Sequence, residues 1–201
     1  MRILITGGNG DLANFVKSEL EQEFEVSSPT RGELDVSCLK SVETYFQHKE
    51  FDVVINAAGT LYSSSVVESK DELWIRDINV NLIGTYLVTK HSLVKNINTR
   101  IINISSTAAY ASYKDWTSYC ASKAGVMKLS SGLVKDGFDV VVLCPGAINT
   151  KLRNGLNIFN PNVMDLKEGA KPILDAVKGA FKSGDIVFYR KNLLEMKEHD
   201  Y

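Results

Sequence analysis

The sequence predicts an α/β fold, a doubly wound parallel sheet between two layers of helices. Short runs such as residues 140–144 are apolar at every position, which is typical of strands buried on both faces. Segments with apolar residues at helical spacing separate these runs, as in residues 12–20. Strands that alternate with helices along a chain form parallel sheets with helices on both faces.

The apolar patterns also predict the order of the elements. We expect strands over residues 2–6, 24–28, 51–55, 101–104, 140–144 and 185–189. We expect one helix after the glycines at 7–10, and others over about 38–49, 71–95 and 119–135 and up to about 182. Ser37 is expected to cap the helix over 38–49, and the mostly charged final residues to form an exposed tail.

The region after the second strand is shortened. Residues 34–36 follow the strand over 24–28 too closely for a helix to lie between them. We therefore expect a reduced sheet edge here, with 34–36 as either a vestigial strand or a loop.

Composition indicates a single soluble domain over residues 1–201. The net charge of -1 gives no reason to expect a nucleic-acid or membrane partner, and no apolar run reaches membrane-spanning length. Three widely spaced cysteines argue against a disulfide framework, and three scattered histidines show no metal-site spacing. The chain enters a strand and a glycine loop at once, which leaves no room for a signal peptide and favours a cytoplasmic location.

A tyrosine and a lysine four residues apart occur four times, and one pair has a distinctive context. The pairs begin at Tyr45, Tyr86, Tyr110 and Tyr119. Residues at this spacing share one helix face, and a nearby ammonium lowers the pKa of a phenol. Only Tyr119 follows a serine by thirteen residues at the end of a strong strand. Parallel sheets bind ligands at that end of their strands, so we expect the other three pairs to be structural.

This central stretch resembles the active site of the short-chain dehydrogenase/reductase superfamily, whose members have Rossmann-like folds. The motifs that carry the resemblance are Asn103-Ile104-Ser105-Ser106 and Tyr119-Cys120-Ala121-Ser122-Lys123. It implies hydride transfer between a nicotinamide and a carbonyl/alcohol pair, with Tyr119 as general acid/base. It also implies that Ser106, not Ser105, bonds the substrate oxygen. Lys123 would lower the pKa of the phenol and hold the nicotinamide ribose.

A fourth catalytic residue is implied by the stretch Asn79-Val80-Asn81-Leu82-Ile83-Gly84-Thr85, which resembles the N-x-x-G-T motif of the family. The matching asparagine is Asn81. The resemblance implies that Asn81 opens the helix locally and holds a water beside the lysine. The alternative is ordinary, because an asparagine inside a helix more often faces solvent.

The first strand, glycine loop and helix predict a pyrophosphate site, because glycines allow close approach and the helix N-terminus offers free N–H groups. The glycine spacing resembles the extended, nucleotide-sugar branch of the family, whereas the active site resembles the core branch. Asp11 would repel a pyrophosphate unless it pointed away, and we expect it to cap the helix. The expected cofactor-binding residues here are Thr6, Gly7, Gly8, Asn9, Gly10, Asp11 and Leu12.

Three further segments resemble cofactor motifs of the family. Asp35 and Val36 would lie against the adenine. The stretch Asn56-Ala57-Ala58-Gly59 would let the cofactor pass close to the sheet, with Asn56 bracing neighbouring strands. The residues implied to hold the nicotinamide are Pro145, Gly146, Ile148 and Thr150.

The loop after the second strand favours NADP(H) over NAD(H). NAD-binding members of the family usually place an acid there for the ribose hydroxyls, and this strand ends in Ser27-Ser28-Pro29-Thr30-Arg31. The hydroxyl of Thr30 and the guanidinium of Arg31 suit a phosphate. In the alternative, Arg31 is a solvated turn residue and Glu33 reaches back to the ribose.

The substrate is expected to be a small carbonyl or alcohol compound in an aromatic-lined pocket. Its expected lining is Ala108, Tyr110, Tyr113 and Trp116, with a lid over residues 151–164 that contributes Leu152, Leu156, Ile158 and Phe159. Two alternatives remain open, a small nucleotide-sugar keto-reductase or epimerase and a non-catalytic NADP-sensing protein. The resemblance further implies a homodimer or homotetramer paired through the helices over 71–95 and 118–135.

Overall fold

Seven strands form one sheet in the order β2-β1-β3-β4-β5-β6-β7 in this computed structural model, which describes residues 1–154, 156 and 160–198. The first six strands are parallel, and β7 pairs antiparallel with β6. The strands are β1 Arg2–Ile5, β2 Glu25–Ser27, β3 Val53–Asn56, β4 Arg100–Ile104, β5 Val140–Pro145, β6 Ile186–Arg190 and β7 Leu193–Lys197. The predicted α/β fold is confirmed.

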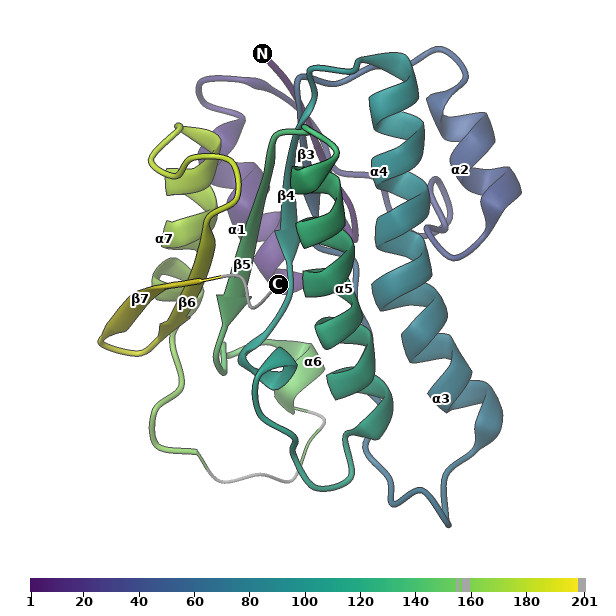
Figure 1. The fold of residues 1–201 in the computed structure, drawn as a ribbon, viewed down its shortest axis with the longest axis vertical. Helices are drawn as coiled ribbons and strands as arrows, with labels where there is room; N and C mark the ends of the chain where they lie inside the picture. Colours follow the sequence, from purple (N-terminus) through teal and green to yellow (C-terminus); the bar gives the residue numbers. More distant parts are fainter. Residues whose placement is uncertain (155, 157–159, 199–201) are drawn as a thin grey trace.

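Helices cover both faces of the sheet (Figure 1). The first and last long helices, α1 and α7, pack together on one face, whereas α2, α4 and α5 cover the other. Besides these, a π-helical turn (η1) and a 3₁₀ turn (η2) interrupt the regular elements. The helical elements are α1 Asp11–Leu20, α2 Leu39–Phe46, α3 Asp71–Ile78, η1 Asn79–Ile83, α4 Gly84–Lys95, η2 Thr107–Ala109, α5 Thr117–Lys135, α6 Lys151–Asn154 and α7 Leu166–Val177.

Burial on both faces explains why the strand sequences are continuously apolar. In β1, Ile3 and Ile5 face the core under α1 and α7, whereas Leu4 faces the core under α2 and α4. All three side chains are fully buried. Full burial of one such side chain is worth about 1.5–3 kcal/mol, so both helical layers are held to the sheet by the same strands.

The predicted helix over 71–95 is interrupted. Its first part, α3, leads into the π-helical turn η1, and α4 continues from Gly84. A single π-helical turn widens the backbone and is frequent at functional sites. Asn81 lies inside this turn, so the local opening of the helix that the family resemblance implies is present.

The chain after β6 is a strand rather than the predicted exposed tail. The turn places Asn192 at a φ of 61°, a conformation that asparagine tolerates well. Leu193–Lys197 then pairs with β6 as the edge strand β7.

The α7 helix ends at Val177, earlier than the predicted end near 182, and Gly179 follows at a φ of 82°.

The shortened region after β2 is confirmed, and residues 34–36 form a loop rather than a strand. Leu34 and Val36 are buried against the face under α2. The prediction that Ser37 caps α2 is wrong. Cys38 occupies the N-cap position, and the Ser37 hydroxyl instead donates to Asp35 Oδ1 at 2.6 Å.

The helices of the described residues all fall short of the length and apolar character needed to cross a membrane. The histidines, cysteines and acids among the described residues form no cluster that could hold a metal ion. The cysteines Cys38, Cys120 and Cys144 are free thiols.

Candidate active site

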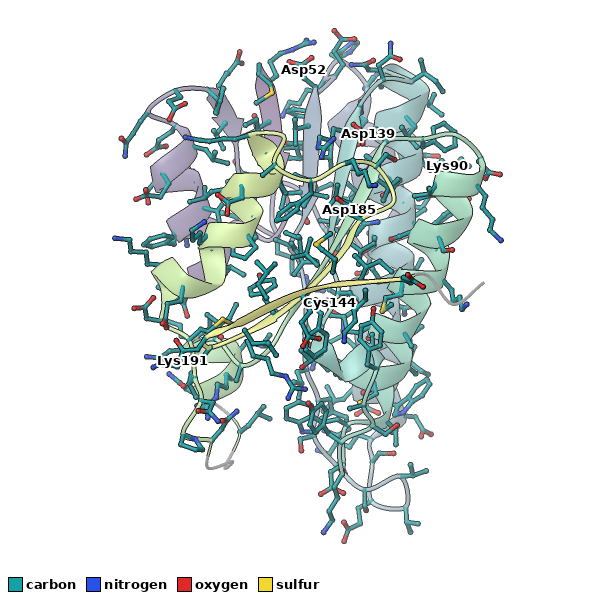
Figure 2. The ribbon with its side chains drawn as sticks, turned by 60° about the vertical axis from the view of Figure 1, so that its left-hand side comes forward. Asp52, Lys90, Asp139, Cys144, Asp185 and Lys191 are labelled. Atoms are coloured by element: carbon teal, nitrogen blue, oxygen red, sulfur yellow. The ribbon has the colours of Figure 1, made fainter. Side chains whose placement is uncertain are left out.

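A cleft of about 1240 Å³ runs along the carboxyl ends of the parallel strands. It is lined by the segments that follow β1, β3, β4 and β5 and by the start of α5. In Figure 2, Cys144, near the end of β5, lies below Asp52, Asp139 and Asp185, which precede their strands. The cleft therefore lies where parallel α/β sheets bind their ligands.

Tyr119, Ser106 and Lys123 all line this cleft. Tyr119 belongs to the first turn of α5, and Lys123 follows one turn later. The Lys123 ammonium lies 5.6 Å from the centre of the Tyr119 ring and donates to the carbonyl of Ile104 at 2.8 Å. The Ser105 hydroxyl is bonded to the Lys123 carbonyl at 2.8 Å, which leaves Ser106 as the serine that bonds the Tyr119 phenol.

Burial favours the neutral form of both Tyr119 and Lys123. Desolvation raises the pKa of Tyr119 to about 12, and the hydrogen bond from Ser106 opposes this rise. Desolvation also lowers the pKa of Lys123 to about 8. The pKa of the phenol is therefore raised and not lowered as predicted, because desolvation by burial is the largest influence on it.

The other three tyrosine–lysine pairs have structural surroundings. The Lys49 ammonium lies 3.8 Å above the ring of Tyr45, away from the cleft. Tyr86 is exposed on α4. Tyr110 packs edge-on against Phe188, with 5.6 Å between ring centres. None of these three tyrosines lines the cleft in the described part of the chain.

Asn81 is fully buried and does not line the cleft. Its Oδ1 accepts from the backbone N–H of Thr60 at 2.8 Å, and its Nδ2 donates to the Thr60 carbonyl at 2.9 Å. Nδ2 also donates to the Ser122 hydroxyl at 3.0 Å. The solvent-facing alternative is wrong, because this side chain joins the loop after β3 to α5.

The glycine loop fits tightly between two neighbouring segments. Gly7 has a φ of 80°, and a Cβ there would lie 2.8 Å from Ala58 Cα. A Cβ on Gly8 would lie 2.3 Å from the carbonyl oxygen of Ser28. Gly10 is the N-cap of α1 and makes no side-chain cap bond, so the helix N-terminus is open to an anion. The loop residues that line the cleft are Gly7, Asn9, Gly10, Asp11 and Leu12.

The prediction that Asp11 caps α1 is wrong. Asp11 is the first helical residue, and its carboxylate is bonded to the lid segment instead. Oδ2 accepts from the backbone N–H of Lys151 at 2.6 Å, and the Lys151 ammonium lies 3.5 Å from Oδ1. Asp11 thus binds the first residue of α6, 140 positions later in the chain.

Several predicted cofactor-binding residues do not line the cleft but hydrogen-bond to the segments beside it. The Thr6 hydroxyl accepts from the backbone N–H groups of Ala57 and Ala58, both at 3.0 Å. Asn56 Nδ2 donates to Asn103 Oδ1 at 2.8 Å, which confirms that it braces neighbouring strands. The predicted residues that do not line the cleft are Thr6, Gly8, Thr30, Asn56 and Asn81.

At the end of the cleft near β2, Arg31, Asp35 and Val36 are all in the lining. Arg31 Nε donates to Asp35 Oδ2 at 3.0 Å, so the guanidinium is held by its inner nitrogen. Glu33 accepts from the backbone N–H and the hydroxyl of Thr30, both at 2.8 Å. Its carboxylate therefore points to Thr30 and lines no part of the cleft. This argues against Glu33 as a ribose ligand.

The opposite end of the cleft is partly aromatic. Tyr113 and Trp116 line it, whereas the predicted Ala108 and Tyr110 do not. The Trp116 ring stands edge-on to Tyr119, with 5.9 Å between ring centres. Leu152 and Leu156 line the cleft as predicted, and Ile158 and Phe159 lie outside the described residues. The predicted nicotinamide segment lines the cleft through Pro145, Gly146, Ile148 and Thr150.

A family model described as short chain dehydrogenase matches residues 1–160. The chain belongs to the short-chain dehydrogenase family. Relatives of this short-chain dehydrogenase include an uncharacterized oxidoreductase of Staphylococcus aureus, 27% identical over 88% of this chain and 80% of that protein. Another is 3-oxoacyl-[acyl-carrier-protein] reductase of Haemophilus influenzae, 33% identical over 59% of this chain and 54% of that protein.

Two solved structures show the same fold as this short-chain dehydrogenase. One is a small-chain dehydrogenase in complex with NADPH, with a TM-score of 0.84 and 20% identity over 94% of this chain and 96% of that one. The other is a variant of actinorhodin polyketide ketoreductase with NADPH, with a TM-score of 0.69 and 23% identity over 77% of this chain and 73% of that one.

Sequence reasoning missed Asp77, a fully buried acid of α3 beside the start of α5. Trp74, Asp77 and Asn81 are spaced three and four residues apart, so they share one helix face. Side chains on this face of the short-chain dehydrogenase bond to α5 at Thr117, Ser118 and Ser122. That spacing was the available signal, although a charged residue on a buried helix face is rare.

The bond between Asp11 and Lys151 predicts that Asp11 steadies the lid. Asp11→Ala should raise the hydrogen-exchange rate of the Lys151 amide about tenfold or more, because a hydrogen bond to a charged group is worth about 1.5–3 kcal/mol. Amide exchange followed by mass spectrometry or NMR checks this. The control Asp175→Ala, which breaks an exposed ion pair on α7, should leave the lid unchanged. An unaltered Lys151 amide in Asp11→Ala would contradict the prediction.

Proposed function

We propose that this protein is an NADP(H)-dependent oxidoreductase that interconverts a carbonyl and an alcohol by hydride transfer, with Tyr119 as the general acid/base. The observation that carries the proposal is the meeting of Tyr119, Ser106 and Lys123 in the cleft that also holds the glycine loop. Family membership supports the reaction class, and the two similar structures that contain NADPH support the cofactor class.

The residues of the cleft fit a nicotinamide dinucleotide. Its volume of about 1240 Å³ exceeds the roughly 300–1,000 Å³ of ordinary ligand pockets. Gly7 and Gly8 leave no room for a Cβ, and the open N-terminus of α1 suits a pyrophosphate. Arg31, Asp35 and Val36 would hold the adenosine end, and the segment from Pro145 to Thr150 the nicotinamide end. When bound, the cofactor supplies the hydride.

The pKa values of the site suit the reducing direction. A phenol with a pKa of about 12 keeps its proton at neutral pH and can donate it to a carbonyl oxygen. Ser106 would hydrogen-bond that oxygen, and the Lys123 cation would stabilise the negative charge that develops. Asn81 would act by holding the loop after β3 and the widened turn η1 in place; its part in a water relay stays a prediction.

A small nucleotide-sugar keto-reductase is a second candidate. The glycine spacing of residues 7–13 favours it, because it departs from the core-branch pattern. The non-catalytic NADP-sensing alternative is less well supported, since Tyr119 and Lys123 both line the cleft. NADPH oxidation with a panel of ketones, aldehydes and keto-sugars distinguishes the three functions.

Tyr119→Phe should reduce turnover about 100-fold or more, because it removes the proton donor and leaves the ring in place. NADPH binding, followed by fluorescence, should persist. Tyr45→Phe and Tyr86→Phe, whose phenols lie outside the cleft, serve as matched controls and should keep wild-type turnover. Wild-type turnover in Tyr119→Phe would refute the catalytic assignment.

Arg31→Ala should weaken NADPH about tenfold and leave NADH nearly unchanged, because the guanidinium would pair with the 2′-phosphate by a charge-assisted bond. The loss should shrink at high salt. Fluorescence titration of both cofactors measures it. Lys40→Ala removes an exposed cation of α2 that lies outside the cleft and should change neither affinity. Equal losses for NADPH and NADH in Arg31→Ala would show that Arg31 does not read the phosphate.

A homodimer or homotetramer is proposed from the family resemblance and from exposed apolar side chains along α3, η1 and α4. Ile75, Ile83, Tyr86 and Val94 are all more than two-fifths exposed. Sedimentation should detect a dimer or larger assembly, and Ile83→Glu should shift it toward the monomer. Val67→Glu, in the loop before α3 and 96% exposed, is the control. A wild-type monomer at high concentration would count against this assembly.

A further inference from the structure

We propose that Asp77 is a positioning residue for the reaction, a buried carboxylate that fixes the first turn of α5 and thereby aims Tyr119 and Lys123. The inference rests on the proposed function, in which these two residues act on the substrate oxygen. It concerns a residue that contacts neither substrate nor cofactor and acts through its hydrogen bonds and its charge.

The surroundings of Asp77 are built for a carboxylate. The side chain is 0% exposed. Its Oδ1 accepts from the Thr60 hydroxyl at 2.7 Å, and Oδ2 accepts from the backbone N–H of Tyr62 at 2.7 Å and the Ser118 hydroxyl at 2.8 Å. The Arg76 guanidinium lies 3.5 Å from Oδ1. A buried charge is costly unless it is paired and hydrogen-bonded, and here three donors hydrogen-bond the carboxylate and one guanidinium pairs with it.

Asp77 is the middle member of three side-chain bonds that join α3 and η1 to α5. Trp74 Nε1 donates to the Thr117 hydroxyl at 3.0 Å. Asn81 Nδ2 donates to the Ser122 hydroxyl at 3.0 Å. Between them lies the bond from Ser118 to Asp77. The three bonds fix the rotation of α5 about its own axis over its first two turns.

That rotation decides where the reacting groups point. Ser118 and Ser122 are one turn apart, and each directly precedes Tyr119 or Lys123. Successive helical residues are about 100° apart around the axis. When the two serines are held against α3 and η1, the next residue of each pair is directed into the cleft, where Tyr119 and Lys123 lie.

The same carboxylate also holds the segment that follows β3. Thr60 directly follows Gly59 and Tyr62 comes two residues later, and Gly59 and Thr60 both line the cleft. Asp77 therefore connects the part of the cleft proposed for the cofactor to the helix that carries the acid. A shift of about 1 Å between the bound cofactor and the acid would be enough to slow the proposed reaction strongly.

The charge of Asp77 adds an electrostatic effect. Burial lowers the pKa of Lys123, and the negative charge of Asp77 opposes this by raising it. The pKa of Tyr119 is raised first by burial, and the charge of Asp77 raises it further. Burial raises the pKa of the neighbouring Cys144 thiol to about 12, so it stays neutral at neutral pH. The charged group facing Asp77 itself is Arg76. Loss of the Asp77 charge should therefore lower the pKa of Lys123 further, and the ammonium should lose its proton at lower pH.

Asp77→Asn tests the proposal, because it removes the charge and keeps the shape. We expect turnover to fall about tenfold to 100-fold, while the Kd for NADPH stays within about threefold. The NMR titration of ¹³C-labelled lysine, with the Lys123 signal assigned through Lys123→Arg, should shift to lower pH. The basic limb of the activity profile should move the same way. Asp71→Asn, an exposed acid at the start of α3, is the control and should behave like the wild type.

Ser118→Ala separates position from charge. It removes the bond to α5 and keeps the Asp77 carboxylate, so turnover should fall while the Lys123 titration stays in place. Unchanged turnover and titration in folded Asp77→Asn would overturn the proposal. If Asp77→Asn does not fold, wild-type turnover in folded Ser118→Ala overturns it equally. Full activity of Tyr119→Phe would refute the proposed function instead, and the lysine titration would still report the charge of Asp77.

Discussion

Lys123 joins α5 to the sheet through two hydrogen bonds, and the rest of the site depends on this connection. Its ammonium donates to the carbonyl of Ile104 at the end of β4, and its own carbonyl accepts from the Ser105 hydroxyl. Lys123 is only 5% exposed, so its stem and head are fixed together. Because β4 is buried on both faces, the core fixes the position of Ile104. The bond from Lys123 to Ile104 thereby fixes the position of α5 along the sheet.

Buried polar bonds extend this connection across neighbouring elements. Asn56 of β3 donates to Asn103 of β4, and Asn103 donates to Ser130 of α5 at 2.8 Å. Each such bond is worth only about 0.5–1.5 kcal/mol net, but a buried group left without its partner costs about 1–3 kcal/mol. Shifting α5 to another register would therefore cost more free energy than the bonds contribute to the native register. The network thus holds the residues of α5 that line the cleft in one position.

The sequence was sufficient to predict the elements that depend on local pattern, but not those that depend on distant partners. The strands, the glycine loop and the turn of α5 that carries Tyr119 follow from apolar runs and motif spacing. Asp11 could not be placed, because its partner Lys151 is 140 positions away. Ser37 satisfies the local rule for a helix cap and yet bonds Asp35. The edge strand β7 was missed because its charged composition resembles a tail, although Asn192 provides a hairpin signal.

Burial moves the pKa values of Tyr119 and Lys123 in opposite directions. Desolvation disfavours the phenolate and the ammonium alike, so the pKa of Tyr119 rises to about 12 while that of Lys123 falls to about 8. At neutral pH the phenol holds its proton and the lysine keeps its charge. A weak acid beside a cation transfers its proton readily only to an oxygen that is gaining negative charge. In the proposed reaction the carbonyl oxygen of a substrate under reduction would be such an oxygen, so the protonated phenol of Tyr119 would suit proton donation as the hydride arrives.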